Sequence, residues 1–192
     1  MFTIKENLEN KIIINKSIFI TKLIKIKNVN DFNEKMKEIK NEYKYATHYC
    51  YAYIIDNYKK ESDDGEPKGT AGIPIMETLD KFKLNYVLCV VIRYFGGIKL
   101  GAGGLIRAYR KSVSNVLNSN KEKIIELIDG CILRISIPYN QQKKLEKLLD
   151  CSYCKTYDEM VNYTIECSNY QKEILEKKYK IDILKTQKIE KA

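Results

Sequence analysis

The sequence predicts an α+β protein with two domains. Short apolar runs that alternate with a period of two are interleaved with segments in which apolar residues recur at helical spacing. The character of the chain changes near Asp129 and Gly130. The last third reads as strand, helix, two strands, helix and strand, which is the ferredoxin-like βαββαβ pattern. We therefore expect an N-terminal domain over residues 1–128 and a ferredoxin-like domain over residues 129–192.

The N-terminal elements follow from periodicity and from helix-end signals. Asp31 is the expected cap of the first helix, with Phe32, Met36 and Ile39 on its apolar side. Pro74 suits the first turn of a short helix. The expected elements are strands at 11–14 and 17–27, a helix at 30–44, a strand at 46–56, a polar loop at 57–72, a helix from Pro74 to about Lys83, a buried strand at 85–93 and a helix from about Gly104 to Asn118.

The last third holds shorter elements. Pro138 ends a strand because proline cannot donate to a sheet ladder. Leu145, Leu148 and Leu149 are the apolar residues of the helix that follows. The expected elements are a strand at 132–137, a helix at 139–150, strands at 153–157 and 160–167, a helix at 169–179 and a final strand at 181–189.

The chain is basic, with a net charge of +9 and 31% charged residues. This balance favours a partner such as RNA, DNA or the ribosome, although a solvated Lys-rich surface would give the same composition. No stretch of 18 apolar residues occurs and no signal peptide is apparent, so we expect a cytoplasmic protein without membrane contact. In that compartment the six cysteines are expected to be thiols, with Cys89 in the core.

Glycine is concentrated in one window, because eight of the nine glycines lie between Gly65 and Gly104. A buried strand ending at Arg93, a glycine turn and a helix start form an arrangement that binds anions, since backbone N–H groups converge there. The spacing matches neither the dinucleotide fingerprint nor the Lys-containing phosphate loop. Tight helix–sheet packing is the alternative. The expected anion-contacting glycines are Gly96, Gly97, Gly101, Gly103 and Gly104.

A basic face is expected on the following helix. Arg107, Arg110 and Lys111 share one side, opposite the apolar residues. Arginine is rare in this chain, and its planar guanidinium suits phosphate. We therefore expect Arg93, Arg107 and Arg110 to contact phosphate; the alternative is a solvated outer face.

An acidic loop, Asp63 to Glu66, precedes these elements. The carboxylates of Asp63, Asp64 and Glu66 could hold a hard cation, but Asp-Asp-Gly is also strong turn chemistry, and we favour a structural or partner-contacting use. Thr70 could add a hydroxyl to a phosphate site. We expect no metal and no cofactor.

Two arrangements with cysteine point away from catalysis or zinc. His48, the only histidine, lies two positions before Cys50 on one strand, a poor geometry for proton transfer. His48 is instead expected to border the groove formed by the acidic loop. Cys151 and Cys154 form a single CxxC without a second such pair.

Two long motifs are similar to signature stretches of the YigZ/IMPACT family: residues 62–74 and 91–109. Lys16-Ser17-x-Phe19 and the segment around His48 and Cys50 resemble earlier marks of that family. The resemblance implies an N-terminal fold like domain 2 of ribosomal protein S-five, a two-layer α/β unit, followed by the ferredoxin-like domain. It also implies a link to translation. Eukaryotic members oppose a starvation-sensing kinase through a further N-terminal domain, for which we expect no counterpart here.

Three functional hypotheses follow. The first is a non-enzymatic, translation-linked regulatory protein that binds RNA or the ribosome through the glycine turn and basic helix. The second is an enzyme or sensor for a small phosphorylated metabolite or nucleotide, with Mg²⁺ held by the acidic loop. The third is a protein-interaction module. We favour the first and a monomeric protein.

Overall fold

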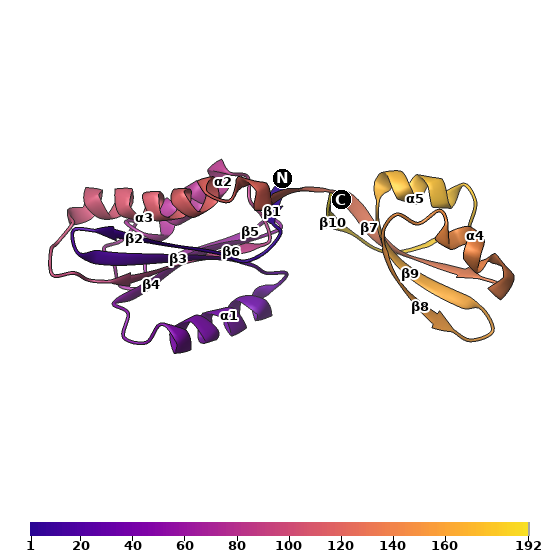
Figure 1. Cartoon of the computed structure of the whole chain (residues 1–192), viewed down its shortest axis with the longest axis horizontal. Helices are drawn as coiled ribbons and strands as arrows, with labels where there is room; N and C mark the ends of the chain where they lie inside the picture. Colours follow the sequence, from indigo (N-terminus) through magenta and orange to yellow (C-terminus); the bar gives the residue numbers. More distant parts are fainter. Residues whose placement is uncertain (192) are drawn as a thin grey trace. The chain divides into compact units, whose positions relative to one another are not determined.

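The chain forms two compact units in a computed structural model that describes residues 1–191 (Figure 1). The units are Met1–Ile125 and Glu126–Ala192. This division lies three residues before the boundary at 128/129 expected from the sequence. None of the described helices combines the length and the apolar character needed to span a membrane.

The N-terminal unit is built on a sheet in which the strands do not lie in chain order. Neighbouring strands in this sheet are antiparallel. The order is β2-β3-β6-β4-β5. A short strand, β1, precedes them, and its Phe2 bridges to Leu84. The strands are β1 (Phe2–Ile4), β2 (Leu8–Ile14), β3 (Ser17–Lys25), β4 (His48–Ile55), β5 (Tyr58–Ser62) and β6 (Val87–Tyr94).

Helices cover both faces of this sheet (Figure 1). Helix α1 (Val29–Glu42) packs on one face, whereas α2 (Gly72–Lys81) and α3 (Gly101–Asn118) pack on the other. The expectation of two layers was therefore wrong for this unit, which has three. The reason lies in β6, which is buried along nearly its whole length and so needs cover on both sides.

The segment expected as a loop at 57–72 contains strand β5, so that expectation was partly wrong. Asp56 has a left-handed φ of 54° and turns the chain back on itself. Tyr51 then pairs with Ser62 and Ile55 with Tyr58. β5 is an edge strand made almost entirely of exposed polar residues, so it lacks the apolar alternation by which strands are recognised.

The cap of α1 also differs from the expectation. The Asn28 side-chain oxygen accepts hydrogen bonds from the backbone N–H groups of Asn30, at 2.8 Å, and Asp31, at 3.1 Å. Asp31 lies inside the first turn, where its carboxylate accepts from Lys27 N at 2.7 Å. Both residues are good N-caps, and sequence spacing alone does not separate them.

The C-terminal unit has the element order βαββαβ, as expected. Its sheet order is β10-β7-β9-β8, with antiparallel neighbours throughout. Leu145 from α4 and Leu175 from α5 join the core on one face of this sheet. α4 is a single short helix rather than the longer one expected at 139–150. The elements are β7 (Ile124–Ile137), α4 (Gln142–Glu146), β8 (Ser152–Tyr157), β9 (Val161–Ser168), α5 (Asn169–Glu176) and β10 (Asp182–Glu190).

Candidate functional site

The acidic loop is organised around Asp63, which caps the start of α2. Its carboxylate accepts hydrogen bonds from the backbone N–H groups of Gly69 at 2.8 Å, Ala71 at 2.9 Å and Gly72 at 2.8 Å. Burial acts to raise the pKa of Asp63, but the three backbone donors outweigh it and hold that pKa below its usual value. Asp63 therefore stays ionised, and its carboxylate is used to accept backbone hydrogen bonds at the start of α2.

Asp64 connects the same loop to the beginning of β4 through hydrogen bonds. Its carboxylate accepts from Tyr49 N at 2.6 Å, and its carbonyl oxygen lies 2.8 Å from His48 Nδ1. Asp64 and Gly65 both have left-handed φ values, 42° and 87°, which produce a tight turn. Asp63 and Asp64 thus each have backbone partners, and residues 1–191 contain no group of three or more His, Cys, Asp or Glu side chains that could hold a metal ion.

Glu66 points into the protein and forms the centre of a buried polar cluster. Its Oε1 accepts a hydrogen bond from Arg93 Nη1 at 2.6 Å and another from the Tyr109 hydroxyl at 2.7 Å. His48 Nε2 lies 3.9 Å from its Oε2. The side chains of Glu66 and Arg93 are only 3% and 5% exposed. A carboxylate this deeply buried needs such partners, since an unpaired buried charge is very costly.

Two weak acids in this cluster are held in their neutral forms. The Cys50 thiol donates to the Asp63 carbonyl at 2.9 Å and lies 3.2 Å from the Tyr109 hydroxyl. Burial raises the pKa of Cys50 and that of Tyr109 far above their usual values. Cys50 is therefore a thiol and not a thiolate nucleophile, which agrees with the sequence-based argument against a His48–Cys50 catalytic pair.

The structure places Arg93 inside the protein, away from the exposed face that carries Arg107 and Arg110. Besides Glu66, it donates to Ser17 Oγ at 3.3 Å. Its guanidinium lies over the ring of Phe19, 5.4 Å away, and over that of Phe95, 5.6 Å away. Its Nε makes no hydrogen bond to the described residues. Arg93 thus joins the two long motifs to each other and to Ser17 of β3. Thr70 is also turned inward, donating to the Pro67 carbonyl at 2.6 Å.

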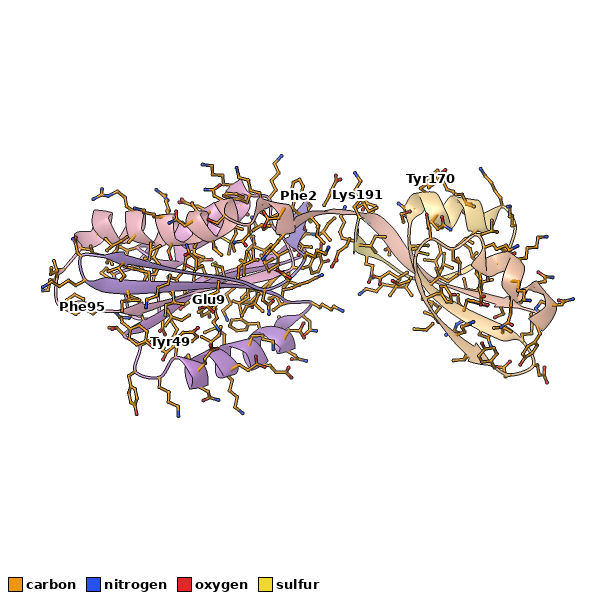
Figure 2. All side chains as sticks on the ribbon, in the orientation of Figure 1. Phe2, Glu9, Tyr49, Phe95, Tyr170 and Lys191 are labelled. Atoms are coloured by element: carbon orange, nitrogen blue, oxygen red, sulfur yellow. The ribbon has the colours of Figure 1, made fainter. Side chains whose placement is uncertain are left out.

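The glycine turn meets the tip of the β2–β3 hairpin at one end of the N-terminal unit, near Phe95 (Figure 2). A Cβ atom on Gly96 would lie 2.0 Å from the backbone carbon of Lys16, so only glycine allows this approach. The Gly96 N–H also donates to Ser17 Oγ at 3.2 Å. Gly97 and Gly101 adopt left-handed φ values of 84° and 68°.

Helix α3 starts earlier than expected, at Gly101 rather than Gly104. Gly101, Gly103 and Gly104 therefore form its first turn instead of a preceding loop. This turn has no side-chain cap and no acidic residue, so its backbone N–H groups and the positive end of the helix dipole are left without a carboxylate. Anion binding at this helix start stays a prediction.

A groove runs between the first turns of α3 and the hairpin tip. Its volume is about 310 Å³. Arg107 and Lys111 bring two positive charges to it, and no carboxylate is among the described residues that line it. We call it the α3 groove. Its lining residues are Ile14, Asn15, Leu100, Gly104, Arg107, Ala108 and Lys111.

The structure does not bring all the expected site residues together in one place. Arg107 and Gly104 line the α3 groove, whereas Arg110 forms an ion pair with Glu77 of α2. Glu66, Arg93 and His48 belong to the buried cluster. Sequence reasoning missed the contribution of the hairpin tip, Ile14 and Asn15, to the groove. The signal available was the Asn15-Lys16 pair between two strand patterns, which is typical of a tight hairpin turn.

Comparison with known proteins gives the family. A family model described as the Impact N-terminal domain matches residues 15–117, more than half of the chain. The chain belongs to the IMPACT family. It is 46% identical over 154 residues to IMPACT family member YvyE of Bacillus subtilis (strain 168), and this alignment covers 77% of this chain and 69% of that protein. Residues 15–117, which the family model matches, contain the buried cluster and most of the α3 groove.

Further relatives agree with this membership. An IMPACT family member of Haemophilus influenzae is 32% identical over 175 residues, covering 88% of this chain and 75% of that protein. IMPACT family member YigZ of Escherichia coli (strain K12) is 38% identical over 109 residues, with 54% and 53% covered. A crystal structure of a hypothetical protein aligns with a TM-score of 0.65 over 96% of this chain and 97% of that chain. At 24% identity it shows a shared fold alone.

Proposed function

We propose that this IMPACT family protein is a translation-linked regulatory protein that binds RNA or the ribosome through the α3 groove. The observation that carries the proposal is the pairing of Arg107 and Lys111 with an uncapped helix start, in a groove whose described lining has no carboxylate. Backbone N–H groups at a helix start and nearby cations both favour phosphate oxygens. The translation link comes from family membership, and the net charge of +9 supports a polyanionic partner.

The buried cluster has a supporting role in this proposal. The ion pair between Glu66 and Arg93 connects the acidic loop to β6. The hydrogen bond from Tyr109 to Glu66 connects the same loop to α3. Arg93 and Gly96 both contact Ser17, which holds the hairpin tip against the glycine turn. The cluster therefore positions the two walls of the groove without contacting the ligand.

The proposal also assigns each unit an architecture. The βαββαβ order and the strand order β10-β7-β9-β8 support a ferredoxin-like assignment for the C-terminal unit. For the N-terminal unit, we retain the likeness to domain 2 of ribosomal protein S-five as a proposal, with α1 as the additional layer.

The first test is binding to purified ribosomes and to short RNA at low and moderate salt. The groove variant is Arg107→Ala/Lys111→Ala, and the control is Lys37→Ala/Lys44→Ala, which removes the same charge from exposed positions outside the groove. We expect salt-sensitive binding that the groove variant loses and the control retains. Equal loss in both variants would indicate general attraction by a basic surface, and binding unchanged in the groove variant would contradict the proposal.

A second candidate function is favoured by the size of the groove. A volume of about 310 Å³ is at the lower end of the range for small-molecule pockets, so a nucleotide or another phosphorylated metabolite could be the ligand instead. A thermal-shift screen of nucleotides, with and without Mg²⁺, distinguishes this reading. Stabilisation that rises with ligand concentration and is lost in Arg107→Ala/Lys111→Ala would favour it over RNA. No response at millimolar nucleotide would argue against it.

A further inference from the structure

Three cysteines lie in a row across the sheet of the C-terminal unit. Cys131 of β7 is directly opposite Cys167 of β9. On the other side of β9, Ser152 pairs with Glu166, which brings Cys151 next to Cys167. All three pack in the same apolar core. Directly opposed residues of antiparallel strands have Cα atoms about 4.5–5.5 Å apart, within the roughly 4.4–6.8 Å that a disulfide spans.

Exposure selects one of the three as the reactive thiol. Cys131 and Cys167 are fully buried, whereas Cys151 is half-buried immediately before the edge strand β8. The Cys167 thiol, acting as a hydrogen-bond partner, lowers the pKa of Cys151, against the opposing effects of burial and of the nearby carboxylates of Asp150 and Glu166. The same contact raises the pKa of Cys167. A thiolate is the nucleophilic form of cysteine, and Cys151 is the member of the row that favours it.

The CxxC spacing does not supply the partner of Cys151. Tyr153 packs its ring against that of Tyr163, 5.6 Å away, on the core side of the sheet. Because successive strand residues point to opposite faces, Cys154 lies on the other side, where it is exposed. Three residues of strand also separate the two cysteines by about 10 Å. Cys167 is therefore the thiol that Cys151 can reach.

We propose that Cys151 and Cys167 form a reversible disulfide when the protein meets a peroxide. The Cys151 thiolate attacks one peroxide oxygen, the O–O bond breaks, and hydroxide leaves, so that Cys151 becomes a sulfenic acid. The Cys167 thiol then gives up its proton and attacks the Cys151 sulfur, and the sulfenic oxygen leaves as water. Two thiols are oxidised and one hydrogen peroxide is reduced to two waters. The bond joins the edge strand β8 to β9, and thiol reductants reverse it.

The test treats the reduced full-length protein with hydrogen peroxide, blocks the remaining thiols and measures intact mass and tryptic peptides. Trypsin places Cys151 and Cys154 together in residues 148–155 and Cys167 in residues 156–172. The mapping is therefore done in Cys154→Ser, which leaves one thiol in the first peptide. We expect the oxidised chain to carry two fewer blocking groups than the equally blocked reduced protein, with these two peptides joined. Dithiothreitol added before blocking should restore the full number of blocking groups.

Two variants decide the assignment. Cys151→Ser, a change at a half-buried position, should abolish the intramolecular bond while the protein remains folded by circular dichroism. Cys154→Ser should form the bond at the wild-type rate. The proposal is overturned if Cys154→Ser loses the bond, if peroxide yields only dimers linked through Cys154, or if the bridge joins residues 124–134, which contain Cys131, to residues 156–172.

Discussion

Arg93 donates a 2.6 Å hydrogen bond to Glu66, and both side chains are almost completely buried. Glu66 belongs to the first long motif and Arg93 to the second, so this contact joins the two motifs in the folded protein. The pair also contacts Ser17 through Arg93 and α3 through Tyr109. A charge pair therefore fixes the elements that form the α3 groove.

Glu66→Gln should destabilise the N-terminal unit by about 3–5 kcal/mol, because it leaves the Arg93 charge buried without a carboxylate. The double variant Glu66→Gln/Arg93→Met should be less destabilised than the single one. Hydrogen exchange measured along the chain tests this, with faster exchange expected in β6. Peptides from β9 of the other unit are the internal control, and unchanged protection of β6 would refute the argument.

Asp63→Asn should cost about 1–2 kcal/mol near neutral pH, because one of the acceptor oxygens that cap α2 is lost. The pKa of Asp63 is lowered in the folded protein, so its stabilisation is complete above its unfolded pKa of about 3.9 and is lost as pH falls through the lower folded pKa. The difference between wild type and variant should therefore shrink in strong acid. Urea unfolding at several pH values measures it, with the exposed Glu61→Gln as control. A difference independent of pH would contradict this role.

Gly96→Ala should destabilise the N-terminal unit by about 3 kcal/mol or more, because the new methyl group would collide with the backbone at Lys16. Gly97→Ala meets no atom within 4 Å and suffers only from its left-handed φ, so roughly 1 kcal/mol is expected. Thermal unfolding of the two variants gives the comparison. Equal effects would show that the hairpin tip moves away from Gly96 at little cost.

Arg107→Ala should weaken RNA or ribosome binding more than Arg110→Ala does. Arg107 lines the α3 groove, whereas Arg110 is already paired with Glu77 outside the groove lining. Each lost phosphate contact reduces affinity, so we expect a severalfold loss for the first variant and less than about twofold for the second. Titration of labelled RNA under one salt condition tests the order, and the reverse order would move the binding face toward α2.

The sequence predicted much of the fold because its strands and helices carry strong periodic signals. β6 is an unbroken apolar run, and α3 has a clear division between Tyr109 and Val113 on one side and Arg107 on the other. β5 was missed because an exposed edge strand needs no apolar residues. The third layer was missed because the sequence pattern of α1 shows that it is amphipathic but not which face of the sheet it packs on.

The special backbone of the glycine window was predicted from the sequence, whereas the binding role of its residues stays a prediction. Glycine content identified the turn, since close approach at Gly96 and left-handed φ at Gly97 restrict the residue type. The burial of Arg93 could not be read from composition, because an arginine suits a phosphate and a buried carboxylate equally well. Only the folded structure shows that Glu66 turns inward to meet it.

The salt dependence of RNA binding tests the central claim most directly. Affinity of a short single-stranded RNA is measured over a range of salt for wild type, Arg107→Ala/Lys111→Ala and Lys37→Ala/Lys44→Ala. Each phosphate contact adds about 0.7 to the magnitude of the slope of log affinity against log salt, so two lost contacts should reduce it by roughly 1.4. We predict this reduction for the groove variant and little change for the control. The same slope and affinity in the groove variant and wild type would contradict the proposal that the α3 groove binds phosphate.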